Sequence, residues 1–325
     1  DGDAQRALRG DERVRGPRFD RAVAPGGYLW WYLDALSDDG RHGLTIIAFV
    51  GSVFSPYYAR ARARSRWNMA DPLEHCAINV ALYGPGADAW VLSEYGPGEV
   101  ERTPDMFRVG RSSIAWEGDC LVVRFDERTA VLGQRVAGTV RLYPSAFPNE
   151  PVTIDSRGRH TWWAVAPYAH LEADLVSPGL KIRGHGYHDS NFGDEPLEAA
   201  FVDWNWSRAT LPDRTAVLYD AVRRDGSQLR LGRLFHADGQ VTPLLAPRSV
   251  ELGRTRWLIP RATRTDGGEA RVVRTLEDTP FYARTEVATE LCRAPVKAVH
   301  ESLSLSRFAS PLVQSMLPFR IRRGR

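Results

Sequence analysis

The chain has 325 residues, and its content of 43% hydrophobic and 26% charged residues excludes a disordered or collagen-like protein. Its net charge of +3 is too small to indicate nucleic-acid binding, and no apolar run is long enough for a membrane-spanning helix. The cysteines Cys76, Cys120 and Cys292 are too widely spaced for a metal-ligand motif, and their odd number favours a reducing, cytoplasmic compartment.

In chain order, the first predicted segment is a charged stretch at 1–24 with few large apolar residues, which we expect to be a flexible lead-in. Short apolar runs follow, separated by turn sequences such as those at 37–40 and 83–86. Their spacing leaves no room for intervening helices, so the pattern predicts an antiparallel, mainly β protein whose sheets close or pack to protect their edges. The predicted strands lie at 28–36, 44–54, 76–83, 89–95, 113–116, 120–126, 138–143 and 160–166.

Two tryptophan-rich segments, at 30–36 and 201–206, each precede a polar turn and a second apolar run. This repetition predicts two tandem β domains, at 25–196 and 197–309. The last segment, 310–325, begins with a Ser-Pro helix-start signal and ends in arginines, so we expect a basic tail with a short C-terminal helix.

The densest group of polar side chains lies at 184–193, where glycines bracket two histidines, a tyrosine and an aspartate. Because side chains alternate across a strand, Tyr187 and Asp189 share one face and His188 lies on the other. The same rule places His160 and Trp162 on one face of an upstream strand. A pair of such strands presents imidazole, indole, phenol and carboxyl groups to a common cavity.

Several kinds of site compete for this cluster. A metal site has suitable ligand types in His160, His185, His188 and Asp189, but alternation puts His185 and His188 on opposite faces, so no metal is expected. A serine hydrolase needs a G-x-S-x-G elbow, and a nucleotide cofactor needs a glycine-rich phosphate loop; the sequence has neither motif. The remaining choice lies between ordinary turn and core groups and a functional cavity. The density of hydrogen-bonding groups beside tryptophans favours function.

At these residues the sequence resembles the carotenoid 1,2-hydratases, also called hydroxyneurosporene synthases, of photosynthetic and other carotenoid-making bacteria. The resemblance rests on the motifs at 25–32, 44–58, 160–163 and 186–193. It implies two tandem lipocalin-like β domains and a hydro-lyase that adds water to the terminal double bond of acyclic carotenoids such as neurosporene and lycopene, with no cofactor. It also implies that Asp189 is the catalytic acid. The neighbours of that acid in the family pattern are His160, Trp162 and Tyr187.

Hydration of an isolated alkene needs a proton donor strong enough to form a tertiary carbocation. Burial among indoles disfavours the charged form of a carboxyl group, so we expect a buried Asp189 to stay protonated near neutral pH. Trp162 and Tyr187 can face the cation, and His160 can hold or deprotonate the water that captures it. The aromatic residues predicted to bind substrate are Trp30, Trp31, Trp163, Phe192, Trp204 and Trp206.

Three other functions share part of this pattern. A non-catalytic lipocalin-like carrier of an isoprenoid or lipid needs the aromatic cavity but not the acid. A cofactor-free polyene cyclase adds no water, and a metallohydrolase loses activity in chelator.

The substrate dissolves in lipid, so we expect peripheral association with the bacterial inner, photosynthetic membrane. The C-terminal arginines either touch anionic head groups or remain solvated. They are Arg320, Arg322, Arg323 and Arg325.

Overall fold

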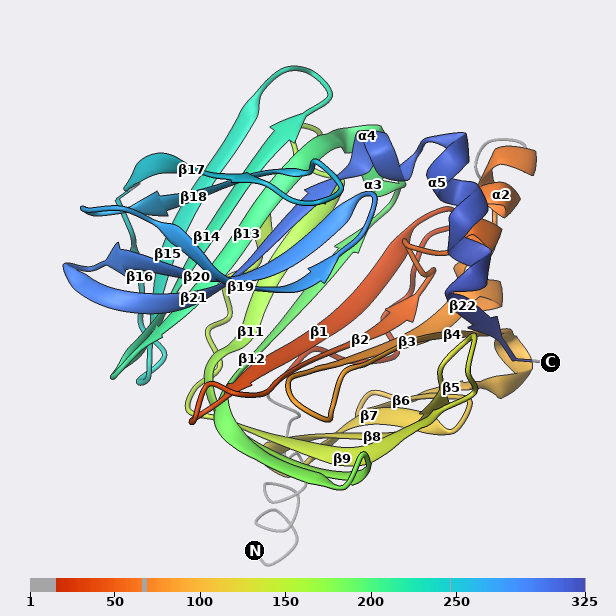
Figure 1. The fold of residues 1–325 in the computed structure, drawn as a ribbon. Coiled ribbons are helices and arrows are strands. Elements are labelled where there is room, and N and C mark those ends of the chain that lie inside the picture. The colour runs from red at the N-terminus through yellow and green to blue at the C-terminus, as the bar shows by residue number, and fades with distance from the viewer. Residues whose placement is uncertain (1–15, 66–68, 246, 325) are drawn as a thin grey trace, which may run out of the picture.

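The protein folds into two twisted β-sheets that face each other across a shared interior (Figure 1). The computed structural model describes residues 16–65, 69–245 and 247–324. Within these residues, the first sheet has 13 strands and curls into a half-barrel, while the second has seven strands and a separate two-stranded hairpin beside it. The mainly β class predicted from the spacing of apolar runs is therefore confirmed.

The first sheet contains residues up to 193 and one strand from the C-terminus. In sheet order its strands are β22 (Ile321–Arg323), β4 (Ala89–Tyr95), β3 (Cys76–Tyr83), β2 (Gly43–Val50), β1 (Tyr28–Ser37), β12 (Leu180–Gly193), β11 (His160–Ser177), β9 (Arg135–Pro144), β8 (Cys120–Arg128), β7 (Ser112–Glu117), β6 (Met106–Val109) and β5 (Val100–Arg102), with β10 (Val152–Thr153) paired to β11.

The second sheet contains residues from 201 to 304. Its strands, in sheet order, are β16 (Val241–Pro243), β15 (Gln228–His236), β14 (Arg214–Arg223), β13 (Phe201–Leu211), β21 (Ala294–Ser304), β20 (Tyr282–Leu291) and β19 (Arg271–Asp278), and the separate hairpin is β17 (Arg248–Arg254) with β18 (Pro260–Thr265). The short helices are α2 (Pro56–Arg64), η3 (Pro72–His75), η4 (Pro97–Glu99), α3 (Leu197–Ala200), α4 (Leu305–Phe308), α5 (Pro311–Met316) and η5 (Leu317–Phe319).

Local turn chemistry sets where the strands of the first sheet end. The strands β3 and β4 have the predicted bounds, but β2 stops at Val50 instead of continuing to residue 54. Gly51 has a φ of 67°, and a Cβ atom there would lie 2.6 Å from the carbonyl oxygen of Gly27. The chain therefore turns sharply at this glycine, which no other residue accommodates without strain.

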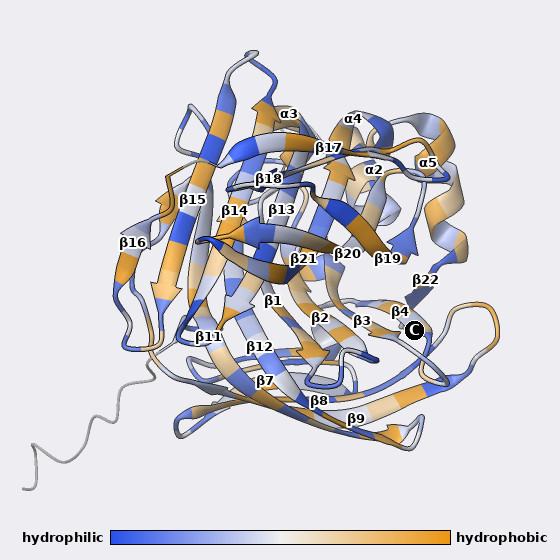
Figure 2. Cartoon of the chain, turned by 60° about the vertical axis from the view of Figure 1, so that its left-hand side comes forward, coloured by the Kyte–Doolittle hydropathy of each residue, from blue (hydrophilic) through white to orange (hydrophobic). Residues whose placement is uncertain are grey.

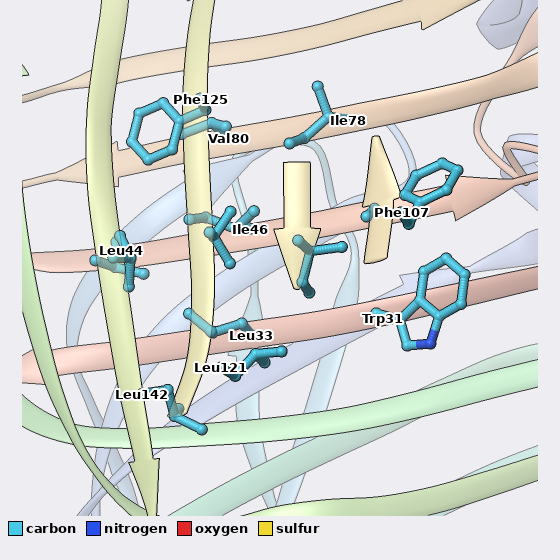
Figure 3. Packing of buried hydrophobic residues seen from close by; sticks show 14 of the residues in the cluster. Trp31, Leu33, Leu44, Ile46, Ile78, Val80, Phe107, Leu121, Phe125 and Leu142 are labelled. Atoms are coloured by element: carbon cyan, nitrogen blue, oxygen red, sulfur yellow. The ribbon is translucent and has the colours of Figure 1, made fainter. Parts of the chain in front are cut away.

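The strand β1 is buried on both faces, so it contributes to two separate cores. Trp31 and Leu33 point into the curl of the first sheet, where Trp31 packs against Phe107 at 5.2 Å between ring centroids (Figure 3). Trp30 and Tyr32 point the other way, into the core between the two sheets. The near-continuous hydrophobic run at 28–36 follows from this double burial, in which each side chain stabilises the fold by ~1.5–3 kcal/mol.

The second part of the expected lead-in is ordered, contrary to expectation. Residues 1–15 lie outside the described part of the chain, but Phe19 is fully buried. It packs edge-on against Trp31 at 4.8 Å between ring centroids, and Arg102 donates a hydrogen bond to its carbonyl oxygen. Phe19 and the hydrogen bond from Arg102 thus attach this charged segment to the half-barrel.

The basic tail contains the predicted short helix, α5, capped by the Ser310 side chain. After this helix the chain does not separate from the fold, because β22 pairs in parallel with β4. Leu317 and Ile321 are buried in the core between the sheets. Figure 1 shows this C-terminal segment passing from the second sheet to the edge of the first. It therefore joins the two sheets. Among the described residues, no helix has the length and hydrophobicity needed to cross a bilayer.

Candidate active site

Asp189 lies in the middle of β12, on the face that looks toward the second sheet. Its Cα atom pairs with Ala164 of β11 on one side and with Tyr32 of β1 on the other. The residue is 5% exposed, and Tyr187, two positions earlier, belongs to the core between the sheets. The period-2 alternation predicted from the sequence is confirmed here, since His188 points to the opposite face and its Nδ1 contacts the carbonyl oxygen of Tyr32 at 2.8 Å.

The two oxygens of the Asp189 carboxyl group have different surroundings. Oδ2 accepts a hydrogen bond from Trp162 Nε1 at 2.8 Å and another from the Tyr187 hydroxyl at 2.9 Å. Oδ1 is buried and has no partner among the described residues. Because Oδ2 is already the acceptor of two donors, the proton of the neutral acid belongs on Oδ1. A buried polar hydrogen without an acceptor costs ~1–3 kcal/mol, so a group that enters the core beside Oδ1 finds this hydrogen free of other partners.

Burial keeps the carboxyl group neutral over most of the physiological range. It raises the pKa of Asp189 to about 8, although the hydrogen bonds from Trp162 and Tyr187 act in the opposite direction. No lysine, arginine or histidine of the described residues forms an ion pair with this carboxyl. The expectation of a buried, protonated carboxyl group agrees with this geometry.

Aromatic side chains from both sheets surround the acid. Tyr187 packs against Tyr32 at 6.2 Å and against Trp206 of β13 at 5.2 Å between ring centroids. On the other side, Trp162 packs edge-on against Tyr219 of β14 at 5.9 Å. Sequence reasoning missed Tyr219, because its contact with Trp162 depends on how the second sheet docks onto the first.

His160 is on the same face as Trp162 but is not next to Asp189. Its Cα pairs with Gly193, four residues along β12, a separation of ~13 Å. Both ring nitrogens are engaged, Nδ1 with the Tyr28 hydroxyl at 2.9 Å and Nε2 with Glu195 at 3.4 Å. The residue is fully buried, and this burial lowers its pKa. A Cβ atom at position 193 would lie 2.7 Å from Nδ1, which accounts for the glycine that ends the motif.

The six aromatic residues predicted to bind substrate divide between the two faces of the first sheet. Trp30, Trp204 and Trp206 belong to the core between the sheets. Trp31, Trp163 and Phe192 belong to the other core, inside the half-barrel. The structure therefore does not bring these three to Asp189. Their positions have the wrong parity, since Trp163 directly follows Trp162 and Phe192 is three residues from Asp189.

An apolar pocket of about 110 Å³ lies between the sheets, over β1 to β4 and next to the strand that carries Asp189. We call it the inter-sheet pocket. Its lining includes Trp30, Tyr32, Phe49, Trp204, Phe281 and Glu301. A larger groove of about 640 Å³ lies beside β17 and β18, but charged side chains such as Arg248, Glu251 and Arg264 form much of its wall. Of these two, the inter-sheet pocket is the one suited to an apolar ligand.

A buried ionic cluster closes the pocket near Tyr32. Asp34 is fully buried and accepts hydrogen bonds from Arg208 Nε at 2.7 Å and from Arg284 Nη2 at 2.6 Å. Arg284 also bonds to Glu301 and, at 2.6 Å, to the Tyr32 hydroxyl. The partners of Asp34 come from the other sheet, which the sequence pattern alone does not indicate. In the described residues, no three His, Cys, Asp or Glu side chains converge as a metal site requires.

Comparison with known proteins agrees with this geometry. The model of the carotenoid hydratase family CrtC matches residues 46–325. The chain belongs to the CrtC carotenoid hydratase family. Its resemblance to the carotenoid 1,2-hydratases is thereby confirmed, and the chain is an enzyme of the hydro-lyase type.

Two members of the CrtC family are similar to this chain over nearly its whole length. The acyclic carotenoid 1,2-hydratase of Thiocapsa roseopersicina is 51% identical over 97% of this chain and 77% of its own length. That of Rubrivivax gelatinosus is 48% identical over 94% of this chain and 76% of its own length.

The fold of this CrtC family member also occurs in a solved structure of low sequence similarity. A putative AttH protein of Nitrosomonas europaea matches with a TM-score of 0.59 and 14% identity, over 85% of this chain and 92% of the other. At this identity the match concerns the fold alone. It supports the mainly β, lipocalin-like fold class expected from the sequence.

Proposed function

We propose that this CrtC family member adds water across the terminal 1,2 double bond of an acyclic carotenoid, with Asp189 as the proton donor. The observation that carries the proposal is the Asp189 carboxyl itself: burial raises its pKa to about 8, and its Oδ1 has no hydrogen-bond partner among the described residues. The two homologues described above carry the name of this activity. The apolar inter-sheet pocket, which lies over strands next to the one that carries Asp189, suits one end of a hydrocarbon chain such as neurosporene or lycopene.

The reaction begins when the Oδ1 hydrogen of Asp189 moves to C2 of the substrate and the π electrons form the new C–H bond. Carbon C1 becomes a tertiary cation, and Asp189 becomes a carboxylate whose Oδ2 keeps its two donors, Trp162 and Tyr187. Water then forms the C1–O bond and loses one proton, giving a tertiary alcohol. The sum is addition of one water with no change in electron count, so no redox cofactor takes part in the proposed step.

The surrounding aromatic rings supply the environment that such a cation needs. Tyr32, Tyr187, Trp206 and Tyr219 present π electrons near the acid, in a core that excludes most water. Attraction of a cation to an aromatic face is worth ~2 kcal/mol or more in such a place. We propose that Trp162 and Tyr187 position the acid, whereas His160, held between Tyr28 and Glu195, braces the ends of β11 and β12.

The decisive test compares Asp189→Asn with the wild type on lycopene in detergent, with no added cofactor. The wild type is expected to give a product heavier by one water, at a rate that falls as the pH rises through about 8 and Asp189 ionises. Asn still accepts from Trp162 and Tyr187 but has no acidic proton, so the rate should fall ~10²–10⁴-fold. Asp174→Asn, at an exposed site on β11, is the control. Full turnover by Asp189→Asn contradicts the proposal; binding without turnover in the wild type identifies a carrier.

We also propose that the enzyme takes its substrate from a lipid surface at its C-terminal segment. Leu312 and Phe319 are 72% and 75% exposed, and Met316, at the end of α5, is 38% exposed. Figure 2 shows hydrophobic positions along α5 in orange. Arg320 and Arg322 follow directly, in the order expected for a segment that inserts apolar side chains below anionic head groups. The same segment lines the inter-sheet pocket. A membrane-dissolved carotenoid would therefore have a short path to that pocket.

A further inference from the structure

The proposed reaction needs a second group, because the water that captures the cation must lose a proton. His160 does not offer a free ring nitrogen, since Tyr28 and Glu195 contact both of them. We propose that Glu301, on the opposite sheet, binds this water and takes its proton. This inference rests on the proposed hydration and names the base that completes it.

Glu301 faces the site from β21. Its Cα pairs with Trp206 of β13, the ring that packs against Tyr187, and with Arg284 of β20. The Glu301 side chain is 13% exposed and lines the inter-sheet pocket. It therefore reaches the same apolar space as the substrate while most of its surface is shielded from water.

Tyr32 connects the two carboxyl groups across the gap between the sheets. Its backbone is the pairing partner of Asp189 in the first sheet, and its hydroxyl donates a hydrogen bond to Glu301 Oε1 at 2.8 Å. The ring of Tyr32 also packs edge-on against Tyr187, which bonds to Asp189. Acid and base are thus both connected to Tyr32, the acid through backbone pairing and Tyr187, and the base through the Tyr32 hydroxyl.

The charges around the two carboxyl groups give them opposite protonation states. Arg284 and Arg208 supply two positive charges to the buried cluster, and Asp34 supplies only one negative charge. The cluster is neutral when Glu301 is ionised, and Arg284 bonds to it directly. Asp189 has no such cation and keeps its proton. Carboxyl groups whose environments differ in this way are typical of an acid and base pair.

One carboxylate oxygen of Glu301 is available to bind water. Tyr32 and Arg284 both donate to Oε1, so Oε2 is the atom available to a molecule in the pocket. Burial raises the pKa of Glu301, with Arg284 acting in the opposite direction, which makes the carboxylate a stronger base than an exposed one.

The proposed second step balances as follows. A lone pair of the water forms the C1–O bond, and the O–H bond that breaks gives its proton to Glu301 Oε2. The turnover leaves Asp189 ionised and Glu301 protonated, and one proton then returns from Glu301 to Asp189 through solvent. Water has supplied both the hydroxyl group and, after this return, the hydrogen on C2.

Isotope exchange separates the base from the acid. In D₂O, a protein that transfers a deuteron to C2 but cannot deprotonate water returns the cation to alkene, and whenever the original C2 hydrogen leaves instead of the added deuteron, deuterium remains in the recovered lycopene. We expect Glu301→Gln to lose hydration ~100-fold or more while it keeps this exchange. Asp189→Asn is expected to lose both, and if it keeps both, the proposed function itself fails.

The matched control is Glu286→Gln. Glu286 is buried and, like Glu301, is a glutamate of the second sheet that pairs with an arginine, Arg274 at 3.2 Å. It is not among the described residues that line the inter-sheet pocket, so its variant should hydrate within about threefold of the wild type. Hydration by Glu301→Gln at the rate of this control, or loss of exchange together with hydration in a folded Glu301→Gln protein, overturns the assignment.

A second variant covers the case in which Glu301→Gln does not fold because Arg284 loses its charged partner. Glu301→Asp keeps the charge but withdraws the oxygens by one methylene from the pocket. Its folding is checked by circular dichroism. It is expected to keep deuterium exchange and to hydrate at least tenfold more slowly, and wild-type hydration by this variant also overturns the assignment.

Discussion

Asp34 and Asp189 lie on neighbouring strands, β1 and β12, and both face the second sheet, yet they hold opposite charge states. Both are buried, at 0% and 5% exposure. Asp34 contacts two guanidinium groups, from Arg208 and Arg284, whereas the partners of Asp189 are an indole N–H and a phenol. Burial alone therefore does not decide whether a carboxyl group is charged; the number of cations that dock from the opposite sheet does.

The largest effect on stability is expected when a cation that contacts Asp34 is removed. Arg284→Met leaves Asp34 and Glu301 with one positive charge fewer in a buried cluster. Removal of one partner of a buried ion pair costs ~3–5 kcal/mol, because the remaining charge is poorly solvated. Urea unfolding measures the loss, with Arg271→Met at an exposed position of β19 as control. A difference below ~1 kcal/mol between the two variants would show that the cluster does not depend on Arg284.

For Asp189, we expect the substitution Asp189→Asn to stabilise the protein relative to the wild type as the pH rises. Its folded-state pKa of about 8 lies above the ordinary value of 3.8. Between about pH 4 and pH 8, the folded protein therefore keeps a proton on Asp189 that the unfolded chain has already released. The wild type therefore loses stability through this window, by ~1.4 kcal/mol per pH unit, while Asp189→Asn does not. Between pH 5 and pH 7, the free energy of unfolding of the wild type should fall by ~3 kcal/mol relative to that of Asp189→Asn. Parallel pH curves for the two proteins contradict a neutral buried acid.

The sequence contains enough information for the first sheet and for one wall of the site. Alternation alone places Tyr187 and Asp189 on one face of their strand and His188 on the other. The apolar runs predict most strands of the first sheet. The run at 160–166 ends before Pro167, yet β11 continues to Ser177. Register shifts at 164–169 absorb the proline as a β-bulge, and a bulge leaves no signal in hydropathy.

The other wall was not predictable from local pattern. Tyr219, Arg284 and Glu301 are separated from Asp189 by 30 to 112 positions in the sequence and reach it only because the second sheet docks face to face on the first. A single alternating strand shows which of its side chains are buried, but not which residues of another sheet cover them. The opposite error, placing Trp31, Trp163 and Phe192 at the site, was avoidable, because their parity already assigned them to the other face.

The smallest expected effect concerns delivery of substrate rather than chemistry. Leu312→Ser combined with Phe319→Ser removes two exposed apolar side chains from the C-terminal segment and leaves its buried residues unchanged. If these side chains insert into lipid, binding to anionic vesicles should fall about tenfold, which corresponds to ~1.4 kcal/mol. Hydration of lycopene dissolved in those vesicles should fall with it, whereas hydration in detergent should not change.

Val131→Ser combined with Leu132→Ser is the matched control for this experiment. These side chains are as exposed as Leu312 and Phe319, at 79% and 83%, but they lie on the turn between β8 and β9, remote in sequence from the C-terminal segment. If the two double variants bind vesicles equally, vesicle binding depends on general surface hydrophobicity, and the proposed role of the C-terminal segment is wrong. A loss confined to the Leu312 and Phe319 variant, with detergent activity intact, separates the capture of the carotenoid from the proton transfer that we propose for Asp189.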